Sequence, residues 1–359
     1  MSSPTWGTRT ALKKIVLCLG FGLFFPALVS CTRNDSNSAK QVNLAIWGSY
    51  LHPDTLAKFT KETGLKINLT HYSSNEELLA KIQSGASGLD VAVPSDYMVT
   101  ILTKMKLLEP LDKSKVSHVA DLLPEHLKQD FDPENAYSLP YAATVTGIAV
   151  HRGLFDGKIS GWKDLLENPA VNGKLALLDD AREVAAAALK LRGQSLNTTD
   201  LVALEQARLD LLKIRPRVKM FTSDSIDILK NQEVAIAQAY SADIMQAMVA
   251  EPKIEFVIPQ EGTSKAIDNL VIVKGAKNIE GAHRLIDFLL SPDIYLELIK
   301  TIRARPVLKG IQDRLPDELK NHPALFPSKD QMKNLESIRD LGEKNRLYED
   351  LWTQMKTGP

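Results

Sequence analysis

The stretch "VNLAIWGSYLHPDTLAKFTKETGLKINLTHYSSNEELLAKIQSGASGLDVAVP", residues 42–94, decides the expected fold. Three apolar runs of strand length alternate with two helical patterns: strands at 42–47, 65–72 and 89–94, helices at 53–63 and 77–84. Pro53 suits the first turn of a helix, and Gly64 suits its end. Ser74 and Glu77 have the spacing of a capping box. This alternation predicts a parallel sheet with helices on both faces.

The same alternation starts again after residue 140. The further elements expected are strands at 146–151, 174–178, 233–240 and 269–276, and helices at 161–168, 180–193 and 279–291. Two α/β units in one chain predict a ligand site between them, at the carboxyl ends of strands. We expect chain crossings near 142–147, 264–269 and 310. One lobe would then hold 42–143 plus 268–310, and the other 144–267 plus 311–359.

Composition narrows the class of function. The chain has 359 residues, of which 44% are hydrophobic and 25% are charged, which is typical of a globular protein. The formal net charge is zero. A nucleic-acid-binding protein needs a concentrated basic surface, so this composition argues against nucleic acid as a partner.

The first 31 residues have the pattern of a bacterial export signal. A basic region precedes an apolar run at 15–29, which ends in Leu28-Val29-Ser30-Cys31. This ending looks like a lipobox, in which the cysteine is lipidated before cleavage; an uncleaved anchor or a chance cysteine is the alternative. We predict a signal peptide at 1–30, a lipid on Cys31, and a flexible tether at 31–41. The protein would then be extracytoplasmic and membrane-anchored, with a net charge of −3, because residues 1–30 carry three basic residues and no acidic one.

No motif for catalysis or for cofactor binding is present in the sequence. The seven histidines are scattered, and the sequence contains no HExxH, CxxC, GxSxG, GxGxxG or GxxxxGK[ST] pattern. We therefore expect no enzymatic activity, no cofactor and no metal site.

Aromatic and acidic residues gather instead at the expected strand ends. They are Trp47 and Tyr50, then Ser95, Asp96 and Tyr97, then Asp179, Asp180 and Glu183, then Tyr240 and Asp268. Each has an ordinary structural alternative: Trp47 suits a core, and Asp180 suits a helix N-cap with Glu183 three residues on. Taken together, carboxylates and aromatic rings suit an organic polycation with an apolar body. We expect Arg182 to hold one carboxylate of its own cluster.

Five blocks of the sequence resemble the bacterial spermidine/putrescine-binding proteins, the extracytoplasmic receptors of polyamine ABC transporters. The blocks are residues 42–64, 89–99, 128–141, 177–184 and 275–293. The resemblance implies a two-lobed, hinged periplasmic-binding-protein fold of type II, a monomer that delivers polyamine to a permease, and no catalysis. It implies that the following residues bind the ligand: Trp47, Ser49, Tyr50, Ser95, Asp96, Tyr97, Asp180, Arg182, Glu183, Tyr240 and Asp268.

Four positions depart from the family pattern. Ser49 stands where an acid is common, Ala266 where a stacking tryptophan is expected, Arg303 near an expected tyrosine, and Ile338 near an expected glutamine. These departures leave the choice among putrescine, spermidine and spermine open. They also leave two alternatives: a receptor of the same fold for another amine or small solute, and a polyamine sensor that feeds no transporter.

Overall fold

The computed structural model describes residues 40–48, 50–85 and 88–358. All of them lie in one compact unit, Ser36–Pro359. The predicted signal peptide, the predicted lipidation site Cys31 and Ser49 lie outside the described residues, as does most of the predicted tether. No helix within the described ranges combines the length and hydropathy needed to cross a membrane.

The first part of the chain forms the predicted strand–helix alternation. β1 pairs in parallel with β2 and with β3, so the central part of this sheet is as expected. Two antiparallel partners, β10 beside β3 and β4 beside β10, make the sheet mixed instead of all-parallel. The elements are β1 (Gln41–Trp47), α1 (Thr55–Thr63), β2 (Lys66–Tyr72), α2 (Asn75–Gln83), β3 (Val91–Ala92), α3 (Asp96–Lys104) and β4 (Leu108–Glu109).

The ends of the first two helices are as predicted, with one shift. Gly64 ends α1 in the left-handed region, at φ 73°, where a glycine is favoured. Ser74 caps α2, because its Oγ accepts from the Glu77 backbone N–H at 3.1 Å. The reciprocal bond of the capping box goes instead to the backbone of Ser73, whose N–H donates to Glu77 Oε2 at 2.9 Å.

The middle of the chain forms a second sheet around β8. β8 pairs antiparallel with β5 and parallel with β6, and β6 pairs with β7. The elements are β5 (Ser138–His151), α4 (Trp162–Leu166), β6 (Leu175–Leu177), α5 (Ala181–Leu191), α6 (Leu201–Ile214), β7 (Val218–Phe221), α7 (Ser225–Lys230), β8 (Ile236–Tyr240), α8 (Ser241–Ala250) and β9 (Ile254–Val257).

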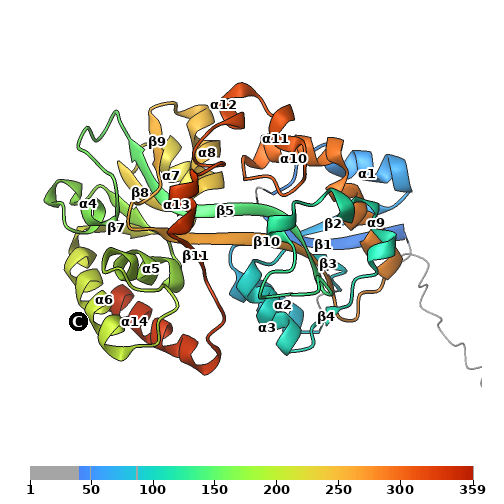
Figure 1. Ribbon diagram of the computed structural model, residues 1–359, viewed down its shortest axis with the longest axis horizontal. Coiled ribbons are helices and arrows are strands. Elements are labelled where there is room, and N and C mark those ends of the chain that lie inside the picture. Colours follow the sequence, from blue (N-terminus) through green and yellow to red (C-terminus); the bar gives the residue numbers. More distant parts are fainter. Residues whose placement is uncertain (1–39, 49, 86–87, 359) are drawn as a thin grey trace, which may run out of the picture. The chain divides into compact units, whose positions relative to one another are not determined.

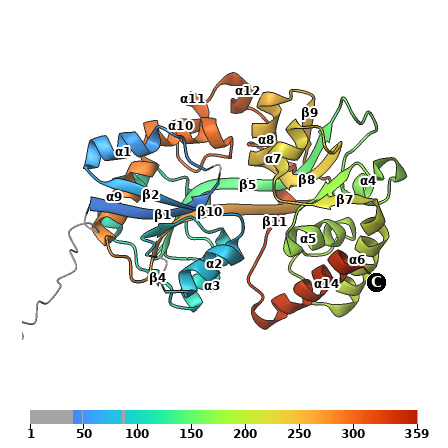
Figure 2. The same cartoon turned by 180° about the vertical axis from the view of Figure 1, so that it is seen from behind.

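Two long strands, β5 and β10, connect the sheets and run side by side through the centre of the unit (Figures 1 and 2). The first half of β5 pairs antiparallel with β10, and its second half pairs with β8 and β9. Both strands begin earlier than predicted, at Ser138 and Thr263. The remaining elements are β10 (Thr263–Val273), α9 (Ile279–Leu290), α10 (Pro292–Ile302), α11 (Ile311–Arg314), α12 (Asp317–Lys320), α13 (Lys329–Lys333), β11 (Leu335–Ser337) and α14 (Asn345–Thr357).

The packing of the C-terminal segment bears on the limits proposed for the two lobes. Ile311, Leu315 and Leu319 are buried in the same apolar cluster as Leu298 and Ile299 of α10. α14 packs on α5 and α6 through side chains that include Tyr348, Leu351 and Met355 (Figure 2), and Ile338 packs against Ala186 of α5. The two-lobed limits remain a proposal. These contacts favour a third crossing after residue 325 over one near 310.

Candidate ligand-binding site

A cavity of about 1100 Å³ lies among the strand ends of both sheets. All ten predicted site residues that the structure describes line it: Trp47, Tyr50, Ser95, Asp96, Tyr97, Asp180, Arg182, Glu183, Tyr240 and Asp268. They come from segments more than 200 residues apart in the chain. The fold brings them together because β1, β3, β6 and β8 end at this cavity and β10 runs past it.

The side chains around this cavity are acidic and aromatic. Eleven carboxylates and seven aromatic rings line it, against only two cationic side chains, Arg182 and Lys265. Carboxylates accept charge-assisted hydrogen bonds from ammonium groups, and aromatic faces attract both ammonium groups and the methylenes beside them. The lining therefore favours an organic cation.

Asp268 is a buried acid of the cavity that a serine hydroxyl holds in place. It is 5% exposed, and its Oδ1 accepts from Ser95 Oγ at 2.7 Å. The Ser95 hydroxyl accepts in turn from Asn75 Nδ2 at 3.2 Å, which fixes its orientation. Burial raises the pKa of Asp268 to about 6, against the lowering effect of the Ser95 and Tyr50 hydroxyls. A bound cation would favour the charged carboxylate and so stabilise its own partner.

Asp96 and Tyr97 begin α3 at the edge of the cavity. Asp96 Oδ1 accepts from the Tyr97 backbone N–H at 2.8 Å, and its Oδ2 is buried with no hydrogen-bond partner among the described residues. Burial raises the pKa of Asp96 to about 7, and the nearby Asp268 adds to the increase. The Tyr97 hydroxyl donates to Glu76 Oε1 at 2.9 Å, which links α3 to α2.

The aromatic residues after β1 form one wall. The Trp47 ring lies 4.6 Å from the Tyr72 ring and 6.5 Å from the Tyr50 ring, centroid to centroid. Trp47 Nε1 donates to the Val93 carbonyl at 2.9 Å, so the indole is fixed against β3 and not free to rotate. Trp47 thus packs on the core and faces the cavity at once.

Asp180 is a helix N-cap, as the structural alternative expected, and also lines the cavity. Its Oδ1 accepts from the backbone N–H groups of Arg182 at 2.8 Å and Glu183 at 3.0 Å. Glu183 is buried beside it, and its Oε2 accepts from Ser264 Oγ of β10 at 2.6 Å. Burial, together with the Asp180 charge, raises the pKa of Glu183.

Arg182 does not hold a carboxylate of its own cluster, so that expectation is wrong. Its guanidinium lies 4.2 Å from the centre of the Tyr348 ring and makes four hydrogen bonds to loops of the C-terminal half. The acceptors are Asn197 Oδ1 at 2.7 Å, Arg339 O at 3.0 Å, Asn345 Oδ1 at 3.1 Å and Leu196 O at 3.3 Å. Arg182 thus fastens the start of α5 to distant loops. Within the described ranges, Asp180 and Glu183 have no ion-pair partner, whereas Asp179 pairs with Lys356 at 2.5 Å.

Several acids that line the cavity were not predicted from the sequence. Asp243 is half-buried one helical turn after Tyr240, and burial, with the nearby Asp224 and Asp268, raises its pKa to about 7. Its position three residues after a strand-end tyrosine was the available signal. Glu76 and Asp227 also line the cavity, from the first turns of α2 and α7.

Three of the four departures from the family pattern can be placed. Ala266 and Ile338 line the cavity, so a methyl group and a branched aliphatic side chain face it where the resemblance implied a tryptophan and a glutamine. Arg303 lies outside it, at the end of α10, where it adopts a left-handed conformation with φ 52°. In the part of the chain that the structure describes, no three or more His, Cys, Asp or Glu residues are grouped to hold a metal ion.

Comparison with known proteins places this geometry in a family. Residues 54–327 match the family described as bacterial extracellular solute-binding protein. The chain is 37% identical over 315 residues to the spermidine/putrescine-binding periplasmic protein of Escherichia coli K12, covering 87% of this chain and 90% of that one. It is 34% identical to the putrescine/cadaverine-binding protein of Pseudomonas aeruginosa, covering 89% of this chain and 95% of that one.

A solved structure confirms the two-lobed periplasmic-binding-protein fold. The spermidine/putrescine ABC transporter substrate-binding protein of Streptococcus pneumoniae superposes with a TM-score of 0.79 at 32% identity, covering 89% of this chain and 99% of that one. The chain belongs to the bacterial extracellular solute-binding protein family, and its relatives in that family include spermidine/putrescine-binding proteins.

Proposed function

We propose that this protein binds a polyamine of the spermidine and putrescine class in the 1100 Å³ cavity and delivers it to an ABC transporter. The observation that carries the proposal is the lining. Among the described residues, eleven carboxylates and seven aromatic rings line the cavity, against two cations, Lys265 and Arg182, and the four hydrogen bonds of Arg182 go to none of these carboxylates. The names of the relatives from Escherichia coli and Streptococcus pneumoniae support the same class of ligand.

The ammonium groups of the ligand would meet two acidic positions. Asp268, held by Ser95, forms one of them, and Asp180 with Glu183 forms the other. The rings of Trp47 and Tyr50 would then pack along the methylenes between the ammonium groups.

Binding would be coupled to a hinge motion. β5 and β10 are the long strands shared by the two sheets, and Asp268 stands on β10 beside a register shift. Asp180 stands at the start of α5, in the second sheet's layer of helices. A ligand that contacts both sides stabilises the closed form, because only differential contact shifts a conformational equilibrium.

The predicted signal peptide supports a location of the protein at the membrane. A lipid on Cys31 and the polar stretch 31–41 would tether the protein outside the cytoplasm, beside its permease. A receptor for another small solute and a polyamine sensor remain the alternative functions.

Calorimetric titration tests the proposal. Putrescine, cadaverine, spermidine and spermine are titrated against the purified protein, with γ-aminobutyrate and sodium glutamate as controls of similar length. We expect one-to-one binding of at least one polyamine and none of the controls. Binding of a control with no polyamine bound would support the receptor for another solute and refute the proposal.

A further inference from the structure

A second cavity, of about 580 Å³, lies on β5 and β10 and has a different character. In the paired strands, Ala143, Val145, Lys265 and Ile267 alternate with Thr144, Ala266 and Asp268. Successive side chains of a strand point to opposite faces. Thr144, Lys265 and Ala266 nevertheless line both cavities, so the two cavities adjoin. Asp268 lines only the first cavity, whereas His126 and Arg305 line only the second.

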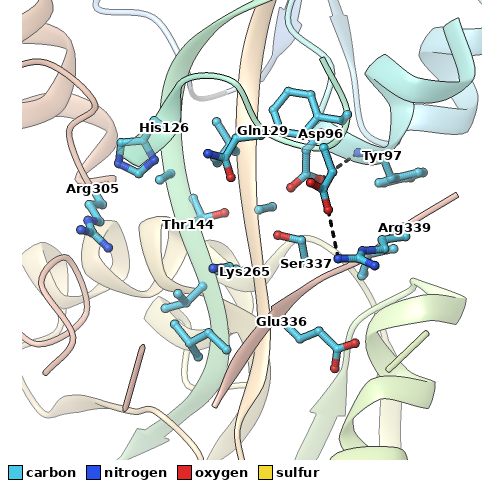
Figure 3. A pocket seen from close by; sticks show the side chains of 18 of the residues that line it. Asp96, Tyr97, His126, Gln129, Thr144, Lys265, Arg305, Glu336, Ser337 and Arg339 are labelled. Atoms are coloured by element: carbon cyan, nitrogen blue, oxygen red, sulfur yellow. Dashed lines mark hydrogen bonds and ion pairs between the residues drawn. The ribbon is translucent and has the colours of Figure 1, made fainter. Parts of the chain in front are cut away.

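Two half-buried cations in this second cavity have no carboxylate partner among the described residues. Figure 3 shows Arg305 beside His126 at one end of the view, and Lys265 at the two central strands. In the described part of the chain, the only hydrogen-bond acceptor of the Arg305 guanidinium is the thioether of Met332, at 3.4 Å. A half-buried cation without an ion-pair partner is unfavourable, and the cost increases with burial.

His126 supplies a third unused donor or acceptor. It is 6% exposed, and its Nε2 is buried with no hydrogen-bond partner within the described ranges. Burial lowers the pKa of His126 to about 4, and the charges of Arg305 and Lys265 add to the decrease while Glu125 opposes it. The imidazole is therefore neutral near pH 7, and its Nε2–H tautomer can donate to an anion.

The backbone holds these groups in place. Arg305 and Ala143 exchange two backbone hydrogen bonds, of 3.0 and 3.1 Å, which fix Arg305 against β5. The turn that carries His126 is tied to the same segment, because the Leu123 backbone N–H donates to the Val307 carbonyl at 2.8 Å. Backbone hydrogen bonds to β5 and to the neighbouring segment therefore fix the positions of Arg305 and His126.

The acids of this cavity are almost all neutralised by neighbours. Three are in ion pairs: Asp130 with Arg339 at 3.2 Å, Glu336 with Lys190 at 2.7 Å, and Asp340 with Lys104 at 2.8 Å. The raised pKa of Asp96 reduces its charge near neutral pH. Glu125, which is exposed, is the one remaining acid of the lining that can balance the charge of the two cations.

We propose that this second cavity binds an organic carboxylate, with its head group on Arg305, Lys265 and His126. A guanidinium binds a carboxylate through two parallel hydrogen bonds, which suits the position of Arg305. The rest of the lining is apolar and would hold a hydrocarbon body: Phe131, Val145, Ile267, Leu325, Met332 and Leu335. The proposal is separate from polyamine binding, because Arg305 and His126 line only this cavity and the ligand is an anion.

The probe is sodium hexanoate, with hexylammonium chloride, hexanol and inorganic phosphate as comparisons. Each is added at about 10 mM to the purified protein, and binding is followed by calorimetry and by the ring signals of His126 in NMR. We expect hexanoate to bind, to shift the His126 signals and to raise the pKa of His126, because an anion favours the imidazolium form. Binding of hexylammonium or hexanol with equal affinity, or of phosphate in place of hexanoate, would overturn the proposal.

Variants assign the head-group contacts. Arg305→Gln and Lys265→Gln should each weaken hexanoate binding by about tenfold or more, since hydrogen bonds to charged groups are the stronger ones. Lys329→Gln is the matched control, because Lys329 is exposed on α13 and lies outside the lining of both cavities. Far-ultraviolet dichroism and melting confirm that each variant is folded. Unchanged hexanoate affinity in both Arg305→Gln and Lys265→Gln would contradict the proposal.

Discussion

One substitution, Asp180→Asn, distinguishes a structural role of Asp180 from a role in ligand binding. Its Oδ1 caps α5 with hydrogen bonds of 2.8 and 3.0 Å, and an asparagine Oδ1 can accept the same two bonds. Asparagine caps about as well as aspartate, so Asp180→Asn should change the free energy of unfolding by less than about 0.5 kcal/mol. Asp180→Ala removes the cap and should cost about 0.5–2 kcal/mol.

The effect of Asp180→Asn on affinity should be much larger than its effect on stability. Removing one partner of a desolvated ion pair costs about 2–5 kcal/mol of binding. At about 1.4 kcal/mol for each factor of ten, the affinity for polyamine should fall about 30-fold or more. The assay is calorimetric titration with spermidine, paired with thermal melting of the unliganded protein.

Asp200→Asn is the control, because Asp200 caps α6 through Ala203 at 2.7 Å and does not line the cavity. It should leave both affinity and melting unchanged. If Asp180→Asn binds spermidine like the parent, Asp180 is a helix cap and nothing more, and the assignment of this acid to the ligand is refuted.

Three further outcomes are expected. Arg182→Met keeps the aliphatic stem but loses four hydrogen bonds and the contact with Tyr348, so the free energy of unfolding should fall by about 2–4 kcal/mol; an unchanged melting temperature would contradict this role. Because the folded-state pKa of Asp268 is raised from 3.8 to about 6, folding favours its protonated form, and the stability of the unliganded parent relative to Asp268→Asn should fall as pH rises through that interval. Polyamine affinity of the parent should increase over the same interval, and a melting and titration series in pH checks both signs. Cys31→Ser should abolish lipidation, which mass spectrometry detects; a lipid still present on the variant would show that the lipobox was misidentified.

Local sequence signals predicted the first sheet well. The strand and helix limits at 42–94 hold to within a few residues, because alternation, Gly64 and Ser74 act within one or two turns of chain. The extent of β5 and β10 was not predictable in the same way. The residues early in these strands adopt strand conformation because the two strands pair with each other. The paired residues lie 120 or more residues apart in the chain, and local propensity does not depend on such distant pairing.

The rule that strand ends meet at one edge predicted that these acidic and aromatic residues lie together. They do line one cavity, although Asp268 lies within β10 and not at its end, and their contact with a ligand stays a prediction. The partners of Arg182 were not predictable, because its acceptors Asn345 and Arg339 lie more than 150 residues away and neither belongs to a motif. Asp243 was missed for a different reason. It stands inside a helix, where an acid usually indicates a solvated face, and only the fold turns that face toward Asp268.

The decisive experiment is a crystal structure of the protein grown with spermidine. We expect one spermidine in the 1100 Å³ cavity, with one ammonium nitrogen about 3 Å from a carboxylate oxygen of Asp268 and another at the same range from Asp180 or Glu183. Spermidine bound only outside this cavity, or held in it without contact to either acidic position, would refute polyamine binding by these carboxylates.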